Sequence, residues 1–258
     1  MSNVAIVLAA GSGKRMNSDV KKQYMLLEGR PIITYSLDVM EKSDIITDVI
    51  LVTSAEDIDY CDREIRDRYG YDKIRSIVPG GRERYHSVMA GLDEIKRLKE
   101  VAGISGDTAD TAVRDDKADH VFIHDGARPF ITEDMLKRLY EEVCLSEACV
   151  AAVRSKDTVK IANSADYVVS TPNRELTWII QTPQVFEYTL AKEAYDILRE
   201  EECGLPCQGI VVTDDAMVVE TWTRHKVKLV EGSYENIKVT TPEDLLFAEA
   251  IVKSKFNK

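Results

Sequence analysis

Short apolar runs alternate along this chain with longer segments whose apolar residues recur at helical spacing. Because the runs lack the polar alternation of half-exposed strands, they predict strands that are buried on both faces. We expect strands at residues 4–10, 48–53, 74–78, 120–124, 148–153 and 226–231. We expect helices at residues 31–40, 55–69, 84–101, 187–201 and 242–253, and another that begins after a Thr132 cap. The alternation predicts an α/β fold, a Rossmann-like three-layer sandwich with a mostly parallel, twisted sheet.

Residues 155–180 interrupt this rhythm with short β-like pieces at 158–162, 167–170 and 178–180, separated by turn residues. We interpret them as a β-arm that protrudes from a single domain spanning residues 1–258. A two-stranded arm is marginally stable alone, which favours packing on a partner subunit in a homodimer. Residues 103–118 are polar and rich in Asp, which predicts an exposed loop without chemistry.

The balance of charge argues against several kinds of partner. With 34 basic and 45 acidic residues, the net charge of −11 argues against binding to nucleic acid or to an anionic membrane. The chain has neither an apolar run long enough to span a bilayer nor an opening signal-peptide pattern, so we expect a cytoplasmic protein. The cysteines lack zinc-type spacing and predict free thiols in a reducing compartment: Cys61, Cys144, Cys149, Cys203 and Cys207.

The first strand ends in a turn of small and basic residues. Gly11 and Gly13 allow backbone N–H groups to approach an anion, and Arg15 and Lys22 add positive charge. The glycine pair alone is more typical of an ordinary strand-to-helix turn. A Walker A loop does not fit, and Met16 stands where a dinucleotide fingerprint needs its third glycine. The full run, Leu-Ala-Ala-Gly-x-Gly-x-Arg-Met with a later Lys-Gln, resembles the nucleotide-binding opening of sugar-phosphate nucleotidyltransferases.

Two motifs follow predicted strands further along the chain. Residues 80–88 combine a glycine pair, which admits a flat base or a ribose, with the hydroxyl of Ser87, although an ordinary helix entry fits equally well. Asp125 stands directly after a buried strand, where a carboxylate suits Mg²⁺ held together with substrate phosphates. Arg128 can brace a phosphate, and the alternative is a turn with an Asp125–Arg128 ion pair. His124 is interpreted as structural.

A last motif lies near the C-terminus, at residues 236–245. Thr241 caps a helix that has Pro242 at its first position and Asp244 at its third. Capping does not explain Lys238, which is therefore a candidate for binding a substrate phosphate.

Together, and in this order, the motifs closely resemble the 2-C-methyl-D-erythritol 4-phosphate cytidylyltransferase family of the non-mevalonate isoprenoid pathway. The resemblance covers nearly the whole chain apart from residues 103–118. It implies transfer of CMP from CTP to methylerythritol phosphate, with release of pyrophosphate and with Mg²⁺ as the cofactor. The attacking phosphate is already ionised, so no general base is expected, and catalysis is expected to come from charge neutralisation and alignment.

The resemblance also implies roles for individual residues. Contacts to CTP are expected from Ala9, Ala10, Gly11, Gly13, Arg15, Lys22, Gly81, Arg84, Ser87, Asp125 and Gly126. Contacts to methylerythritol phosphate are expected from Asp125, Arg128, Thr158, Arg174, Thr182, Thr213 and Lys238, with Arg174 coming from the partner's arm. Asp125 is expected to hold Mg²⁺, and Arg15, Lys22 and Lys238 are the expected catalytic residues.

The chain departs from the family pattern at three positions. Lys21 replaces a usual proline, which predicts a less rigid approach to the phosphates. Arg82 stands at a position that is often acidic and His86 at one that is often Asp or Gln, so details of the contacts to the base are open.

Three rival functions remain to be weighed. A ribitol 5-phosphate cytidylyltransferase shares the first loop and the reaction. A non-catalytic nucleotide-binding module predicts losses among the basic and acidic motif residues, yet Arg15, Lys22, Asp125 and Lys238 are all present. An NAD-linked dehydrogenase conflicts with Met16 and with the absence of an acidic residue at Thr53-Ser54. If the interpretation is right, the first glycine turn must share a cavity with Asp125 and Lys238.

Overall fold

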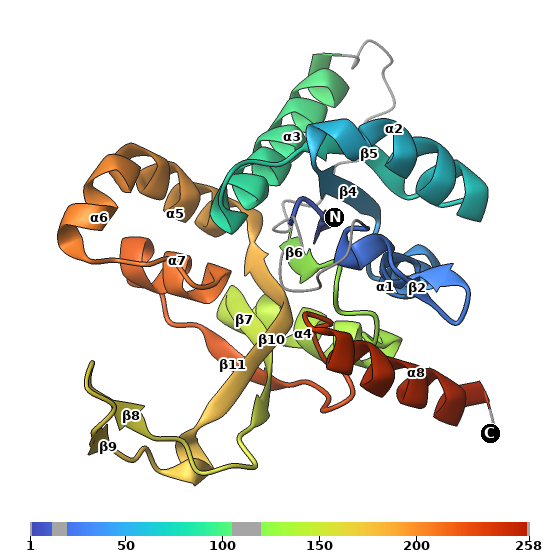
Figure 1. Cartoon of the computed structure of the whole chain (residues 1–258). Helices are drawn as coiled ribbons and strands as arrows, with labels where there is room; N and C mark the ends of the chain where they lie inside the picture. The colour runs from blue at the N-terminus through green and yellow to red at the C-terminus, as the bar shows by residue number, and fades with distance from the viewer. Residues whose placement is uncertain (1, 12–19, 105–119, 257–258) are drawn as a thin grey trace.

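The computed structural model describes residues 2–11, 20–104 and 120–256, and its centre is a seven-stranded sheet with helices on both faces (Figure 1). The strands are β1 Asn3–Leu8, β4 Asp48–Thr53, β5 Ile74–Pro79, β6 His120–Asp125, β7 Ala148–Arg154, β10 Trp178–Glu187 and β11 Lys228–Glu231. They lie in the order β11-β7-β10-β6-β1-β4-β5. The strand β10 runs antiparallel to its neighbours β6 and β7, whereas the other pairs in this sheet are parallel.

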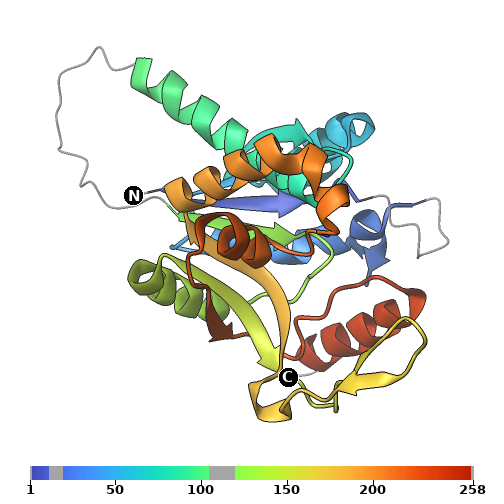
Figure 2. The same cartoon turned by 90° about the vertical axis from the view of Figure 1, so that its left-hand side faces the viewer.

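Side chains alternate along β1 and divide the core into two clusters. The helices are α1 Ile32–Lys42, α2 Ile58–Tyr60, α3 Arg84–Ile104, α4 Glu133–Ser146, α5 Tyr188–Glu201, α6 Leu205–Gln208, α7 Asp215–Thr223 and α8 Pro242–Phe256. Ala5 and Val7 belong to a cluster with α1 and α4, and Val4 and Ile6 belong to one with α3, α5 and α7. Figure 2 shows α3 and α5 on one side of the sheet and α4 on the other. Since neighbouring residues of a strand face opposite sides, one apolar run supports both helical layers. The predicted three-layer α/β fold is confirmed.

The strand expected at 178–180 is the beginning of a longer one. It continues as β10 to Glu187 and enters the middle of the sheet, where Val185 pairs with Cys149 of β7 and Phe122 of β6. The polar residues Gln181 and Thr182, which are buried in this strand, interrupt its apolar run in the sequence. The arm is therefore an excursion between β7 and β10 rather than a separate strand group.

The arm ends in the short hairpin of β8 Ile161–Ala162 and β9 Val168–Ser170, followed by the 3-10 turn η5 Arg174–Leu176. Both views show β8 and β9 projecting from the body of the molecule (Figures 1 and 2). Several large apolar side chains here are exposed, among them Ile161, Val168 and Val169.

Other elements differ from the sequence prediction in detail. Residues 55–69 form consecutive pieces of different pitch, the 3-10 turn η3 Ala55–Asp57, α2 and the π-helical turn η4 Cys61–Asp67. The short strands β2 Leu26–Leu27 and β3 Arg30–Pro31 were not predicted; the two residues between them have positive φ, 47° at Glu28 and 79° at Gly29, as a tight hairpin turn requires. No helix within the described ranges is both long and apolar enough to cross a membrane.

The C-terminal helix α8 packs against the first half of the chain. Ala248 and Val252 form a small cluster with Leu27, Ile32 and Phe130. The preceding segment is tied to the end of β6, because the Val239 N–H donates to the Ala127 carbonyl at 2.9 Å. This attachment places Lys238 beside the loop that follows β6.

Candidate active site

The loops that follow four parallel strands meet at one edge of the sheet. Leu8, at the end of β1, lies in register with Val52 of β4 and Asp125 of β6. Past the strand ends, the Gly126 N–H donates to the Leu8 carbonyl at 2.9 Å and the Gly80 N–H donates to the Thr53 carbonyl at 2.7 Å. These loops therefore share one rim, as expected for the carboxyl edge of parallel strands.

A cavity of about 340 Å³ opens at this edge. Its lining is contributed by Leu8, Ala10, Gly11, Lys22, Gln23, Gly81, Arg82, Glu83, Arg84, Ser87, Asp125, Ala127 and Lys238. The first glycine turn thus shares a cavity with Asp125 and Lys238, which is the arrangement that the sequence interpretation requires. Gly13 and Arg15, also expected here, lie outside the described residues.

Glycine at position 80 allows two loops to come together. A Cβ at Gly80 would lie 2.5 Å from Ser87 Oγ and 2.7 Å from the Ala10 side chain. The Gly81 N–H donates to Ser87 Oγ at 3.3 Å, which holds the turn against the beginning of α3. Residues 80–88 therefore form one wall of the cavity, and the loop that follows β6 contributes to another part of its lining.

Gln23 secures the other side of the entrance. Its Nε2 donates to the carbonyls of Ala9 and Gly11, which lie just after the end of β1. Gln23 and Tyr24 are buried in the short 3-10 helix η2 Lys22–Tyr24. Gln23 itself was not predicted as a site residue, although it belongs to the Lys-Gln pair of the motif.

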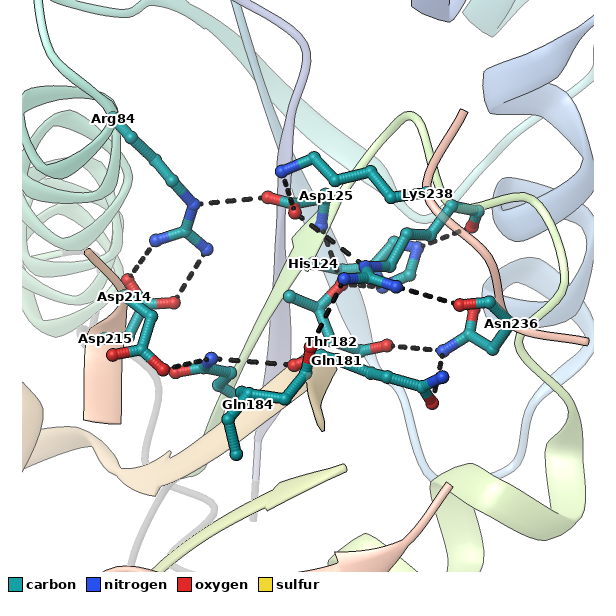
Figure 3. Close-up of polar contacts among 12 residues, drawn as sticks. Arg84, His124, Asp125, Gln181, Thr182, Gln184, Asp214, Asp215, Asn236 and Lys238 are labelled. Atoms are coloured by element: carbon teal, nitrogen blue, oxygen red, sulfur yellow. Dashed lines mark hydrogen bonds and ion pairs between the residues drawn. The ribbon is translucent and has the colours of Figure 1, made fainter. Parts of the chain in front are cut away.

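Asp125 is the centre of the charges in the site (Figure 3). Its Oδ1 accepts from Arg84 Nε at 3.2 Å, its Oδ2 lies 2.6 Å from Lys238 Nζ, and Arg128 Nε is 3.9 Å from Oδ2. Burial alone would raise the pKa of Asp125, but Arg84, Lys238 and Arg128 outweigh it and hold that pKa well below the usual range. Asp125 is therefore ionised at neutral pH.

His124 and Thr182 support Asp125 from beneath. The Asp125 N–H donates to Thr182 Oγ1 at 3.1 Å, and this hydroxyl is 3.0 Å from His124 Nδ1. Burial lowers the pKa of His124 to about 4, so the ring is neutral at pH 7. With Thr182 donating to Nδ1, Nε2–H donates to the Arg128 carbonyl at 3.0 Å. The interpretation of His124 as structural agrees with these contacts.

Arg128 connects the loop after β6 with the C-terminal segment. Its terminal nitrogens donate to the carbonyls of Asn236 at 2.8 Å and Ile180 at 3.4 Å. Its Nε is buried and has no hydrogen-bond partner among the described residues. Burial lowers the pKa of Arg128 despite the attraction of Asp125.

The remaining predicted residues lie around this site at different depths. Ala9 and Thr182 are buried, and Gly126 follows Asp125 directly at the edge of the sheet. Thr213 is exposed just before α7. Thr158 and Arg174 are exposed on the arm and are not among the described residues that line the cavity.

One charged residue of the site was missed by the sequence analysis. Asp215, the first residue of α7, accepts from both terminal nitrogens of Arg84, at 2.6 and 2.8 Å. The signal that could have found it is the Asp214-Asp215 pair ahead of an apolar stretch, which is typical of a helix start.

The donor set fits a metal that is shared with a substrate. The described residues contain no group of three or more His, Cys, Asp or Glu side chains that could cage an ion. Mg²⁺ commonly takes one or two carboxylates and completes its shell with phosphate oxygens and water. The ionised carboxylate of Asp125, at the wall of a cavity with Lys22 and Lys238, supplies such a donor.

A mostly parallel sheet with glycine-containing loops and several cations at its carboxyl edge is typical of an α/β enzyme that binds phosphate groups. Comparison with known sequences refines this class. The chain belongs to the 2-C-methyl-D-erythritol 4-phosphate cytidylyltransferase family, whose sequence model matches residues 3–254.

Individual relatives extend over the same length. The chain is 46% identical over 249 residues to the 2-C-methyl-D-erythritol 4-phosphate cytidylyltransferase of Lachnoclostridium phytofermentans, covering 96% of this chain and 95% of the relative. It is 45% identical over 251 residues to the enzyme of that name in Lachnospira eligens, covering 97% and 99%. Among solved structures, the 4-diphosphocytidyl-2C-methyl-D-erythritol synthase of Anaerococcus prevotii superposes with a TM-score of 0.76 at 33% identity, covering 98% of this chain and 96% of that one.

These matches confirm the family and the reaction expected from the motifs. The chain is a cytidylyltransferase that uses CTP and methylerythritol phosphate in isoprenoid synthesis. Nothing in the matches favours the ribitol phosphate enzyme, the non-catalytic module or the dehydrogenase.

Proposed function

We propose that the cavity around Asp125 is where CMP is transferred, with Lys22 and Lys238 as catalytic residues and Mg²⁺ held by Asp125. An oxygen of the methylerythritol phosphate attacks the α-phosphorus of CTP. The bond from that phosphorus to the bridging oxygen breaks, and pyrophosphate leaves with the electron pair. The observation that carries this proposal is the Asp125–Lys238 ion pair of 2.6 Å in a cavity also lined by Gly11 and Lys22.

Positive charge gathered at this edge opposes the repulsion between two anionic reactants. The chain as a whole has a net charge of −11, yet Lys22, Arg84 and Lys238 line one cavity. Cations fixed where charge develops lower the barrier more than mobile ones, because no reorganisation is needed during the reaction. Lys22 is on the same side as Gly11, so it is the group that we assign to the triphosphate of CTP.

Mg²⁺ fits beside Asp125 because the carboxylate of this residue is negatively charged. Asp125 would hold Mg²⁺, and the ion would supply positive charge against the negative charge that develops on the leaving pyrophosphate. Asp125 supplies the ionised oxygen ligand. Gly81 and Ser87 form the wall beside it and are assigned to the cytidine part of CTP.

Lys238 and Arg128 are assigned to the phosphate of methylerythritol phosphate. Lys238 is 35% exposed and paired with Asp125, so it can exchange this partner for an anion. Arg128 has its unpartnered Nε within 3.9 Å of the same carboxylate oxygen. No general base is required, and the neutral, hydrogen-bonded ring of His124 is not assigned one.

We also propose a homodimer formed through the arm, working in the cytoplasm. The exposed apolar residues Ile161, Val168 and Val169 are suited to burial against a second copy. Thr158 and Arg174, exposed on the same arm, would then reach the partner's cavity. The buried free thiols of Cys61 and Cys149 suit a reducing compartment.

The test is pyrophosphate release with CTP, Mg²⁺ and methylerythritol phosphate, compared with ribitol 5-phosphate as the acceptor. The wild type should use the former, and Lys238→Ala should lower kcat/KM at least about a hundredfold, or about 2.7 kcal/mol. Lys192→Ala is the matched control, because Lys192 pairs with Asp93 at 3.5 Å outside the cavity lining. Near-wild-type turnover by folded Lys238→Ala would contradict the assignment, and faster turnover of the ribitol ester would contradict the acceptor.

A further inference from the structure

Asp215 is a buried carboxylate next to the cavity. The reaction described above assigns it no role. Its side chain has no solvent exposure. Arg84 donates to both of its oxygens, through Nη1 at 2.6 Å and Nη2 at 2.8 Å, and the Tyr195 hydroxyl donates to it at 2.5 Å. A charge buried so completely is costly unless its partners are well placed. The contact is thus a built feature of the site rather than a loose surface pair.

The partners of Asp215 keep their protons. Burial, and then the charge of Asp215, raise the pKa of Tyr195 well above its usual value, so the phenol remains a donor. Burial by itself would lower the pKa of Arg84, but Asp215 and Asp125 raise it well above its usual value. The contact between Arg84 and Asp215 is a two-pronged Arg–carboxylate pair, the strongest geometry for such groups.

This contact determines how Arg84 meets Asp125. With both terminal nitrogens bound to Asp215, the guanidinium presents its Nε–H to Asp125 Oδ1, at 3.2 Å (Figure 3). The other oxygen of Asp125, Oδ2, carries Lys238 at 2.6 Å. One oxygen is thus held by a fixed arginine and the other by a partly exposed lysine that can be exchanged.

We propose that Asp215 is a positioning residue that restrains Arg84 to a single contact with Asp125, so that Oδ2 remains available for exchange between Lys238 and the metal of the CTP complex. The inference rests on the proposed role of Asp125 as metal ligand. Without Asp215, Arg84 would be free to form a two-pronged contact with Asp125 and to occupy both oxygens. The metal would then have to compete with an arginine for its ligand.

The experiment measures CTP binding by calorimetry, with Mn²⁺ as the probe metal and with EDTA in its place, and without any acceptor. The dissociation constant in EDTA divided by that with Mn²⁺ reports the metal contact, because direct contacts of Arg84 with the nucleotide affect both constants and cancel. In Asp215→Asn the ratio should fall about tenfold relative to the wild type, since a neutral amide no longer holds both terminal nitrogens. Asp214→Asn is the matched control. Asp214 caps α7 by accepting from the Met217 N–H at 3.0 Å, and an asparagine oxygen can accept the same bond, so the variant should stay folded and leave the ratio unchanged.

A second variant separates positioning from folding. In the double variant Arg84→Met with Asp215→Leu, neither member of the buried pair is left without its partner, and position 84 no longer carries a cation that could occupy Oδ2. Its ratio should return to within about threefold of the wild type. This variant can contradict the positioning role even if Asp215→Asn alone does not fold.

The outcomes separate the inference from the proposed function. If the wild type shows no preference for the Mn²⁺–CTP complex, the assignment of Asp125 as metal ligand is wrong. If the wild type shows the preference and folded Asp215→Asn retains it, the positioning role is wrong. A double variant with a tenfold lower ratio would also contradict that role, because Asp215 would then act by a route other than Arg84.

Discussion

Lys21 stands where the family usually has proline, and its side chain holds this segment by polar contacts. We expected lysine in place of proline to leave the approach to Lys22 less rigid. Its Nζ instead contacts Ser54 Oγ at 2.6 Å, Glu56 at 2.7 Å and Asp57 at 2.6 Å. These carboxylates raise the pKa of Lys21 against its desolvation, and the hydrogen bond from Lys21 lowers the pKa of Glu56 to about 2. The backbone at Lys21, with φ of −61°, is also the one that proline would adopt.

We therefore predict that Lys21→Ala lowers kcat/KM about three- to tenfold while changing stability by less than about 1 kcal/mol, because partly exposed ion pairs contribute little to folding. Lys21→Pro, which restores a rigid backbone without the charge, should recover most of the activity. Steady-state kinetics and thermal unfolding of the two variants provide the measurement. Equal losses in both variants would show that the charge, and not the rigidity of the segment before Lys22, is what matters.

At the scale of elements, pattern and structure agree where a run is long and apolar. The strand 48–53 was predicted with the bounds that β4 has, and α5 begins one residue after its predicted start. Pattern missed α7, whose nine residues include Asp215, because the helix is short and its apolar residues are not confined to one stripe. It also cut β10 short, since the polar side chains in this strand depend on hydrogen bonds to groups far away in the sequence. Gln184, for example, accepts from the Ala216 N–H at 2.8 Å and donates to Asp214 at 3.1 Å.

Asp244, at the beginning of α8, is expected to make the stability of the protein depend on pH. Asp244 Oδ2 accepts from the N–H and Oγ1 of Thr240, both at 2.8 Å, and from the Thr241 N–H at 2.9 Å. Burial alone would raise the pKa of Asp244, but these hydrogen bonds hold it below the usual range. A carboxyl whose pKa is depressed by folding adds stability above its unfolded pKa, and this stability is lost as the pH falls through the folded pKa.

Asp244→Asn should therefore reduce the free energy of unfolding by about 1 kcal/mol at pH 7, and the difference from the wild type should shrink below about pH 3.9. Urea unfolding at several pH values measures both. A difference that stays constant down to pH 2 would mean that the charge of Asp244 does not contribute.

At the scale of the whole molecule, the arm is the part that the body leaves without cover. Tyr167, Val168 and Val169 are 73%, 58% and 65% exposed, values that a folded monomer seldom shows for neighbouring apolar residues. The arm also carries Arg174, far along the chain from the cavity residues. A second copy would explain both features.

We predict that Val169→Asp together with Ile161→Asp converts the protein to monomers in light scattering and lowers activity by at least about tenfold, because a buried charge opposes association. Mixed dimers test the shared site. Inactive Arg174→Ala and Lys238→Ala chains, when mixed, should recover up to about a quarter of wild-type activity, since half of the dimers hold one intact site. No recovery, with mixed dimers present, would contradict a site shared between subunits.

The sequence by itself determined the alternation of the long buried strands with the long helices and the positions of the motifs at strand ends. Buried strands need apolar runs, and close approach of loops needs small residues, so both leave a local signal. That is why Gly11, Ser87, Asp125 and Lys238 could be expected at one edge before any coordinates were known.

Only the tertiary structure decided which charges are paired. The contact between Arg84 and Asp215 joins residues 131 positions apart, and the path of β10 depends on polar partners supplied by α7. Such contacts depend on burial and on the relative placement of elements, for which a linear pattern carries no signal. The same limit applies to the carboxylate of Asp125, because two of the three cations that keep it ionised, Arg84 and Lys238, come from separate parts of the chain.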